Sequence, residues 1–219
     1  MDRYSEITNK NQREIVLLKA FPCVWGKCSF CDYILDNSNF EDEINKVNFE
    51  VLEVINSGSC FELPKATLAK IKEIIKEKKI EKLFLESHWA YKNRIQEMRD
   101  YFEIPITFKI GVETFDYDFR NGYLNKNAKF KTVEELKEYF DSPCIMVGIK
   151  GQTKEMIDRD MDIVLNNFDH ATINVFVNNT SSVKRDEELV NWFSNKYKHL
   201  VDNPKIEILF NNTDFGVGD

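Results

Sequence analysis

The chain has 219 residues, of which 42% are hydrophobic, and it carries a formal net charge of −7. This length can bury one substantial core, while the acidic balance argues against broad binding of a polyanion such as intact tRNA, because that affinity comes mainly from Lys and Arg. No apolar stretch has the length of a membrane span and the amino terminus does not resemble a signal peptide, so we expect a soluble protein in the reducing cytosol that acts on a small molecule.

Short runs rich in β-branched and aromatic residues alternate with amphipathic segments along the chain. The runs predict strands near Glu14–Lys19, Phe49–Ile55, Lys82–Glu86, Ile106–Gly111, Cys144–Ile149, Thr172–Val177 and Ile206–Phe210. Helices are predicted over Lys65–Lys78, over a face formed by Ile157, Met161, Val164, Leu165 and Phe168, and after the acidic turn Asp186-Glu187-Glu188. Because no linker or repeat interrupts this alternation, we expect a single domain of the α/β class, with a parallel sheet covered by helices on its outer face.

Three cysteines form the most distinctive group in the sequence. Cys23, Cys28 and Cys31 follow the first predicted strand, separated by four and then two residues. Three thiolates hold three irons of a [4Fe–4S] cluster and leave the fourth iron open to bind and reduce a small molecule. A structural zinc site would need a fourth ligand, and the next candidates, Cys60 and His88, lie far along the chain without paired spacing. We therefore interpret the three cysteines as ligands of an iron–sulfur cluster.

Two further cysteines, Cys60 and Cys144, lie outside this group, and we expect both in the core. Disulfides are not expected in a reducing compartment.

Polar and small residues follow the predicted strands at their carboxyl ends. They occupy positions 23–31, 56–59, 86–89, 113–114, 150–153 and 178–180. Ordinary turn chemistry favours the same residue types, but ligand sites of parallel α/β folds gather at this edge of the sheet. The sequence therefore predicts a ligand site there, beside the cysteines.

Three short segments resemble motifs of the radical S-adenosylmethionine (SAM) superfamily. Cys28-Ser29-Phe30-Cys31 matches the C-x-Φ-C half of its cysteine motif, Gly111-Val112-Glu113-Thr114 resembles its GVE strand ending, and Gly148-Ile149-Lys150-Gly151 resembles its G-x-I-x-G segment. The resemblance implies a partial (β/α)6 barrel, a [4Fe–4S] cluster, SAM as the source of a 5′-deoxyadenosyl radical, and flavodoxin or ferredoxin as reductant. The first two cysteines are separated by four residues where most members have three, and Gly26 is expected to absorb the additional residue through an unusual φ.

The same resemblance implies roles for residues at the strand ends. Phe30 is expected to contact the adenine of SAM, and Glu86 or Glu113 to accept its ammonium or ribose hydroxyls, although Glu113 is also explained as a solvated loop carboxylate. The positions that would surround SAM are Phe30, Asn56, Ser57, Gly58, Ser59, Glu86, Glu113 and Lys150. Positions 56–59 replace the superfamily's Gly-Gly-Glu segment without matching it by letter. His88 is expected either to carry a proton late in turnover, with Glu113 as the other catalytic candidate, or only to cap its loop.

Within the superfamily, positions 56–61 resemble members that act on 7-deazaguanine nucleosides of tRNA. The short chain and the four-residue cysteine spacing most resemble lyases that release the base queuine from queuosine 5′-phosphate. The phosphate candidates are Lys92, Arg94, Arg120 and Lys150; those for the base and its diol are Asp32, Asp36, Asp116 and Asn178; those for stacking are Trp25, Tyr33, Trp89 and Phe115. Each of these residues is also explained as a surface charge or as packing. Two alternatives stay open: the same radical chemistry on another modified purine or a peptide, and a small iron–sulfur electron carrier or zinc-binding module.

Overall fold

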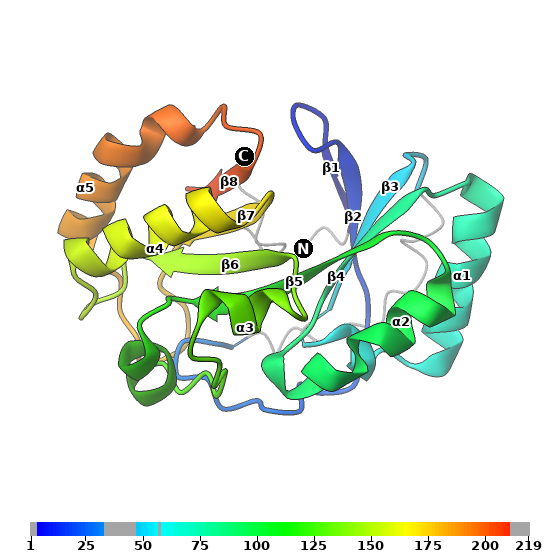
Figure 1. The fold of residues 1–219 in the computed structure, drawn as a ribbon, viewed down its shortest axis with the longest axis horizontal. Helices are drawn as coiled ribbons and strands as arrows, with labels where there is room; N and C mark the ends of the chain where they lie inside the picture. Colours follow the sequence, from blue (N-terminus) through cyan, green and yellow to red (C-terminus); the bar gives the residue numbers. More distant parts are fainter. Residues whose placement is uncertain (1–3, 33–46, 57, 211–219) are drawn as a thin grey trace. The chain divides into compact units, whose positions relative to one another are not determined.

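The computed structural model describes residues 4–32, 47–56 and 58–210, and its strands form one sheet in chain order (Figure 1). Within the described residues the strands are β1 (Tyr4–Ile7), β2 (Arg13–Leu17), β3 (Val51–Ile55), β4 (Lys82–Glu86), β5 (Ile106–Glu113), β6 (Ser142–Val147), β7 (Ala171–Val175) and β8 (Ile206–Leu209). The pairs from β2 to β5 and from β6 to β8 are parallel, while β1 runs antiparallel to β2. The α/β class and all seven predicted strands are confirmed, and β1 is an additional edge strand.

Helices occupy most connections between the parallel strands. The α-helices are α1 (Lys65–Lys78), α2 (Ile95–Phe102), α3 (Val133–Lys137), α4 (Lys154–Asn167) and α5 (Glu187–Tyr197), and the shorter turns are η3 (Cys60–Glu62), η4 (Trp89–Arg94), η5 (Phe119–Tyr123) and η6 (Lys198–Leu200). The three predicted helices correspond to α1, α4 and α5. Side chains cap two of them, because Thr153 accepts from the N–H of Met156 and Asp186 from that of Leu189.

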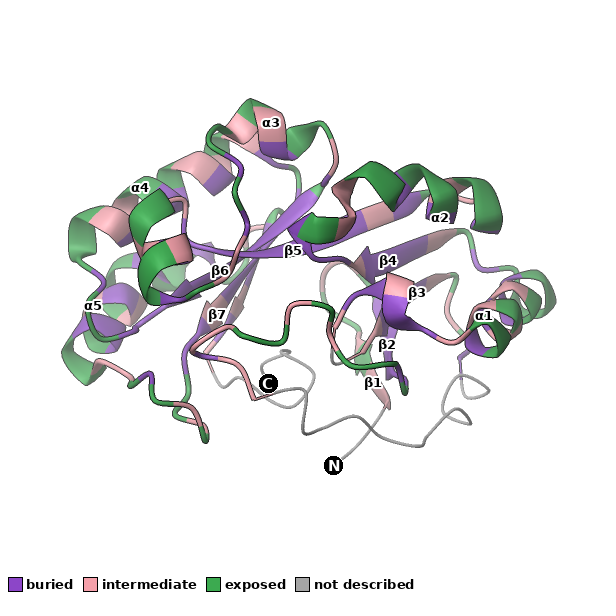
Figure 2. Ribbon diagram, turned by 90° about the horizontal axis from the view of Figure 1, so that it is seen from below, coloured by how far each residue is buried: buried purple, intermediate pink, exposed green. Residues whose placement is uncertain are grey.

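The first of two compact units contains Met1–Gly26 and Tyr33–Lys109. Its helix α1 buries Ile71, Ile74 and Ile75, as the helical spacing predicts. Figure 2 shows its strands largely in the buried colour, with exposed surface on the helices.

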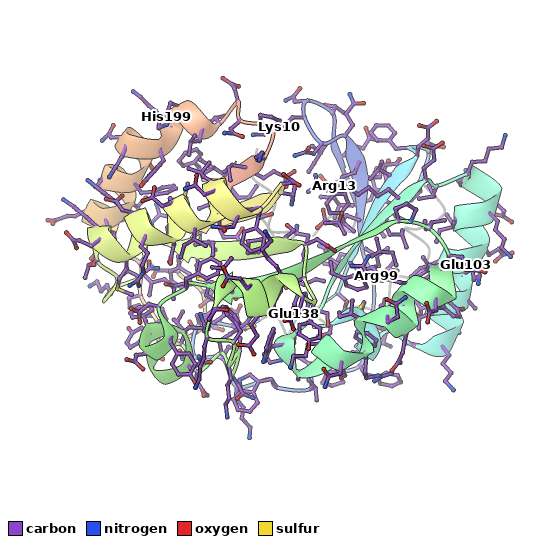
Figure 3. All side chains as sticks on the ribbon, in the orientation of Figure 1. Lys10, Arg13, Arg99, Glu103, Glu138 and His199 are labelled. Carbon is purple, nitrogen blue, oxygen red and sulfur yellow. The ribbon has the colours of Figure 1, made fainter. Side chains whose placement is uncertain are left out.

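A buried ion network lies on the strands of this first unit. Arg13, labelled on β2 in Figure 3, donates through Nε to Glu53 Oε2 at 2.5 Å. Lys109 Nζ donates to Glu53 Oε1 at 2.6 Å. The sheet interior of this unit therefore carries paired charges, which a purely apolar core would not have.

The second unit contains Lys27–Asp32 and Ile110–Asp219, so β5 passes from one unit into the other after Lys109. Helices α4 and α5 both pack against β6. At the end of β6, Gly148 has φ +85°, and a Cβ there would stand 2.3 Å from Cγ2 of Val190 on α5. This close approach explains the glycine at that position. The single domain expected from the sequence stays a prediction.

Within residues 4–32, 47–56 and 58–210, no helix is long and apolar enough to cross a membrane.

Candidate functional site

The cysteine loop follows β2, and its three thiols are the half-buried ones of the protein. Cys23, Cys28 and Cys31 are partly exposed, whereas Cys60 and Cys144 are buried, and all five are free thiols. The core positions expected for Cys60 and Cys144 are thus confirmed, and burial raises the pKa of the Cys60 thiol. Only the loop cysteines therefore present thiols that an external group can reach.

The chemistry of this donor set fits a cubane with one open iron. Three reachable thiols lie in one short loop, and Gly26 between the first two has φ +55°, so the conformation expected for the additional residue is confirmed. Cys23 belongs to the first unit, while Cys28 and Cys31 belong to the second. In the described part of the chain, no three His, Cys, Asp or Glu side chains form a preassembled ion site.

On the first unit, Glu62 holds the cysteine loop against the end of β3. Its Oε1 accepts from the N–H of Val24 at 2.7 Å and from the hydroxyl of Tyr91 at 3.3 Å, and its Oε2 accepts from the N–H of Ser59. Glu62 is buried, and burial is the main cause that raises the pKa of its carboxyl. One buried carboxylate thus ties the loop to the two neighbouring strand ends.

The segment after β3 lies directly against Cys23. A Cβ at Gly58 would stand 3.1 Å from Cα and 3.2 Å from Cβ of Cys23, and closer still to the Glu62 carboxylate. Ser59 is buried and its Oγ accepts from the N–H of His88 at 2.9 Å, while Asn56 Nδ2 donates to the Ser59 carbonyl. Gly58 is therefore required by packing against the first cysteine.

His88 caps the short helix that follows β4. Its Nδ1 accepts from the N–H of Ala90 at 3.2 Å, and its side chain is buried. This is the capping role foreseen as one of its two alternatives, and the proton-carrying role stays a prediction. Glu86, at the end of β4, is half-buried.

On the second unit, Phe30 belongs to an apolar cluster beside two of the cysteines. The cluster contains Phe30, Leu124, Met146, Ile149, Phe176 and Val183, with Cys28, Cys31 and Phe119 packed against it. The Phe30 carbonyl accepts from Asn179 Nδ2 at 2.8 Å. The Phe30 side chain is thus a packing residue of the loop, and its contact with adenine stays a prediction.

Glu113 ends β5 in a conformation that only glycine adopts easily. Its φ is +65°, its side chain is buried, and its Oε1 accepts from Lys126 Nζ at 2.7 Å. Glu113 is therefore not the solvated loop carboxylate weighed as an alternative. A Cβ at Gly111 would stand 2.5 Å from both Glu113 Oε1 and Lys126 Nζ. The glycine of the Gly-Val-Glu segment is thus explained by the room that this ion pair needs.

The turn after Glu113 is clamped by two buried side chains. Arg120 donates to the carbonyl of Thr114, and Asp160 accepts from the N–H of Phe115 at 2.9 Å. Burial raises the pKa of Asp160 to about 6. These contacts restrict the strand end and hold Glu113 in its unusual conformation.

Arg120 is a structural residue, which differs from the phosphate role expected for it. Its side chain is 1% exposed, and it donates to the carbonyls of Thr114, Ala128 and Phe130 at 2.7–2.9 Å. Burial lowers the pKa of Arg120 to about 10. An anion would have to displace these carbonyls and reach a side chain closed to solvent.

The other basic candidates lie at more open positions. Lys150 is exposed, Lys92 is half-buried with its Nζ 4.9 Å from the ring centre of the buried Trp89, and Arg94 is exposed and pairs with Glu97 at 2.8 Å. Hydrogen bonding to Glu97 raises the pKa of Arg94. Lys92, Arg94 and Lys150 are therefore all more accessible to an anion than Arg120, and of the three Arg94 is engaged by a carboxylate.

The polar candidates of the second unit mostly organise loops. Asp32 Oδ2 accepts from Thr180 Oγ1 at 2.8 Å, and Asp32 Oδ1 from Asn179 Nδ2 at 3.3 Å. Asn178 is exposed and accepts from the N–H of Arg185. Asp32 thus joins the cysteine segment to the loop after β7.

Asp116 belongs to the turn after β5. It accepts from the N–H of Phe119 at 2.9 Å and pairs with Arg159 at 3.0 Å, and the bond to Phe119 is the first cause that lowers its pKa. Elsewhere in the cysteine loop, Trp25 is half-buried. The candidates Tyr33, Asp36 and Ser57 lie outside the described residues.

Three organising residues were not among the individual site candidates named from the sequence: Glu62, Lys126 and Asn179. The first carried a usable signal, since Ser59 and Glu62 have the S-x-x-E spacing of a capping box. Asn179 lies in the polar segment 178–180 noted above, but its contact with Asp32, 147 residues away, carried no signal. Lys126 carried none, because it is 13 residues from Glu113.

Comparison with known proteins gives a strong match to a solved structure. No family model matches the chain, and no curated protein does either. Among solved structures, a queuine lyase from Clostridium spiroforme bound to SAM and queuine is 53% identical, with full coverage of both chains and a TM-score of 0.95. A radical SAM methyltransferase, TsrM, from Kitasatospora setae is 11% identical over 74% of this chain and 34% of its own, with a TM-score of 0.46. On the full-length match, the chain belongs to the queuine lyase family of radical SAM enzymes and has their fold.

Proposed function

We propose that this protein is a radical SAM lyase that cleaves queuosine 5′-phosphate and releases queuine. The observation that carries the proposal is the 53% identity, over the whole chain, to a queuine lyase whose structure holds SAM and queuine. The three reachable thiols of the cysteine loop support it from this chain's own residues.

Cys23, Cys28 and Cys31 would hold a [4Fe–4S] cluster, because they are the half-buried thiols and the donor set leaves one iron open. When bound, the cluster and SAM supply an electron and a hydrogen-abstracting radical. The chain supplies order around them: Glu62 fixes the first part of the loop and Asn179 the last part through hydrogen bonds. We also expect flavodoxin or ferredoxin as the electron donor.

Glu113 is the strongest candidate for a polar contact with SAM. Its buried carboxylate lies at a strand end, in a clamped turn, and already accepts from one ammonium group, that of Lys126. An anionic group held in this way suits the cationic amino group of SAM or the hydroxyls of its ribose. The apolar cluster around Phe30 keeps water from the side of the loop that carries Cys28 and Cys31.

The test is a product assay under anaerobic conditions. The purified protein is reconstituted with iron and sulfide, reduced, and supplied with SAM and queuosine 5′-phosphate, and the products are separated by liquid chromatography and mass spectrometry. We expect 5′-deoxyadenosine and queuine from the wild type, and neither from Cys28→Ala. Asn166→Ala, on the exposed side of α4 and outside the loop, is the control and should form both products.

Other results would redirect the proposal. SAM cleavage without queuine release would contradict the assignment of queuosine 5′-phosphate as the substrate and would favour another modified purine or a peptide. One tightly bound zinc per chain, in place of four irons and four acid-labile sulfides, would contradict the enzyme itself and favour a zinc-binding module.

A further inference from the structure

A polar face runs along β6, β7 and β8 within the second unit. Parallel pairing places Cys144 beside Thr172, Met146 beside Asn174, and Thr172 beside Glu207. Because side chains alternate along a strand, these residues share one face with Ser142 and His170. We call Ser142, His170, Thr172, Asn174 and Glu207 the β7 polar face.

The opposite face of the same strands is apolar. It carries Ile145, Val147, Ile173, Val175 and Ile206, all buried. Helices α4 and α5 pack against β6 and provide buried apolar residues of their own. The polar residues therefore face away from the helical layer, so helix packing does not account for them.

On this face the side chains of Ser142, His170 and Glu207 contact one another. Ser142 Oγ and His170 Nδ1 are 2.6 Å apart, and His170 Nε2 lies 3.2 Å from Glu207 Oε1. These three residues thus form a buried chain of polar contacts. Glu207 is directed to His170, although Thr172 is its neighbour in the register.

The hydrogen bonding of Thr172 and Asn174, on the same face, is incomplete. Thr172 is 2% exposed, and within the described residues neither its Oγ1 nor the buried Oδ1 of Asn174 has a hydrogen-bond partner. A buried polar atom left unpaired costs about 1–3 kcal/mol. Two such atoms on adjacent positions of one face indicate a place where a polar ligand completes the hydrogen bonding.

This pair lies beside the cysteine loop. Asn174 is paired in register with Met146, and Met146 belongs to the same apolar cluster as Phe30. Cys28 and Cys31 pack against that cluster. A molecule that contacts Thr172 and Asn174 therefore lies next to the segment that carries two of the proposed cluster ligands.

We propose that Thr172 and Asn174 form the subsite that binds the heterocyclic base of the substrate, with Asn174 Oδ1 accepting from a ring or amino N–H and Thr172 Oγ1 exchanging a hydrogen bond with the base. Both groups are neutral, and the carboxylate of Glu207 lies on the neighbouring strand, in register with Thr172. The subsite therefore suits an N–H donor and disfavours a phosphate. The proposal rests on the proposed function and names the part of the nucleotide that this face binds.

Binding of two free bases to the reconstituted protein with SAM tests the proposal. The probes are queuine and 7-deazaguanine, which has the same ring system without the aminomethyl-linked cyclopentenediol side chain. Their dissociation constants are measured by equilibrium dialysis. We expect Asn174→Leu to weaken both probes by about tenfold or more, and Thr172→Val by about 5- to 10-fold, because each leaves the base with a lost hydrogen bond. Asn166→Ala, on the exposed side of α4, is the matched control and should bind normally.

Two more readouts separate recognition from structure. SAM affinity should stay within about twofold, and the melting temperature of ligand-free Thr172→Val should equal or exceed that of the wild type, since it removes an unpaired polar atom. A lower melting temperature would show that Thr172 has a structural role and would overturn the proposal. A loss of affinity for SAM alone would overturn the assignment of Thr172 and Asn174 to the base. A loss of affinity for queuine that is absent with 7-deazaguanine would overturn it as well.

The outcome also distinguishes this proposal from the proposed function. If the wild type releases queuine but both variants bind the bases normally, only the base subsite is wrong. If the wild type neither binds the bases nor releases queuine, both proposals fail.

Discussion

Replacing Gly111 with alanine tests how Glu113 is held at the end of β5. A Cβ at this position would stand 2.5 Å from Glu113 Oε1 and from Lys126 Nζ, and 3.3 Å from Lys126 Cε. Gly111 does not have a positive φ, so the backbone accepts alanine and the cost comes from the added methyl group. The side chains that must move are 5% and 12% exposed and form an ion pair, so they cannot simply swing into solvent. Overpacking of this kind costs about 1–3 kcal/mol, which corresponds to a fall of about 2–12 °C in melting temperature for a chain of this length.

The assay is urea and thermal unfolding of Gly111→Ala beside Gly122→Ala. Gly122 has no atom within 4 Å of a built Cβ and no positive φ, so its replacement should leave stability unchanged or raise it slightly. A further Lys126→Ala substitution should reduce the cost of Gly111→Ala, because two of the three close atoms are then gone. If Gly111→Ala is as stable as Gly122→Ala, or if its cost is unchanged in the Lys126→Ala background, the proposed reason for the glycine is wrong.

Three further changes test other parts of the site. Burial raises the pKa of Asp160 from 3.8 to about 6, so the folded state binds the proton more tightly than the unfolded chain. The stability of the wild type relative to Asp160→Asn should therefore fall by up to about 3 kcal/mol as the pH rises from about 4 to about 6. A series of urea unfolding curves in which this relative stability rises with pH would contradict the prediction. Gly26→Ala places a Cβ at φ +55°, so this variant should lose about 1 kcal/mol of stability and retain less iron after reconstitution than the wild type. Gly26→Asn should lose less stability, and equal iron contents in all three proteins would refute the prediction. His88→Asn should keep both the hydrogen bond that caps Ala90 and the turnover, whereas His88→Ala should lose about 1 kcal/mol of stability. A large loss of turnover in a stable His88→Asn variant would show that the imidazole carries a proton.

The strand pattern of this chain can be read from its sequence because the buried parallel strands are nearly continuous apolar runs. The runs around Leu83–Leu85 and Ile145–Val147 are buried in the structure, and parallel strands covered on both faces have this composition. Strand β1 was not predicted, since Tyr4–Ile7 is short and its burial is only partial. Helices α2 and α3 were also missed, because eight and five residues are too few to show a clear helical period.

The site is predictable from local motifs and unpredictable where it depends on distant contacts. The cysteine spacing and the Gly-Val-Glu segment are local, and both lead to the correct family. Arg120 was assigned to phosphate because it follows a strand end, and nothing in the sequence shows that three carbonyls surround it. The unpaired polar atoms of Thr172 and Asn174 are likewise properties of the folded sheet.

The most direct test of the central claim follows one hydrogen atom. Queuosine 5′-phosphate deuterated throughout its ribose is incubated with the reconstituted, reduced protein and SAM, and the 5′-deoxyadenosine formed is examined by mass spectrometry. A radical lyase of the proposed kind transfers deuterium from the ribose into 5′-deoxyadenosine in step with queuine release. Release of queuine together with 5′-deoxyadenosine that contains no deuterium would contradict the proposed reaction.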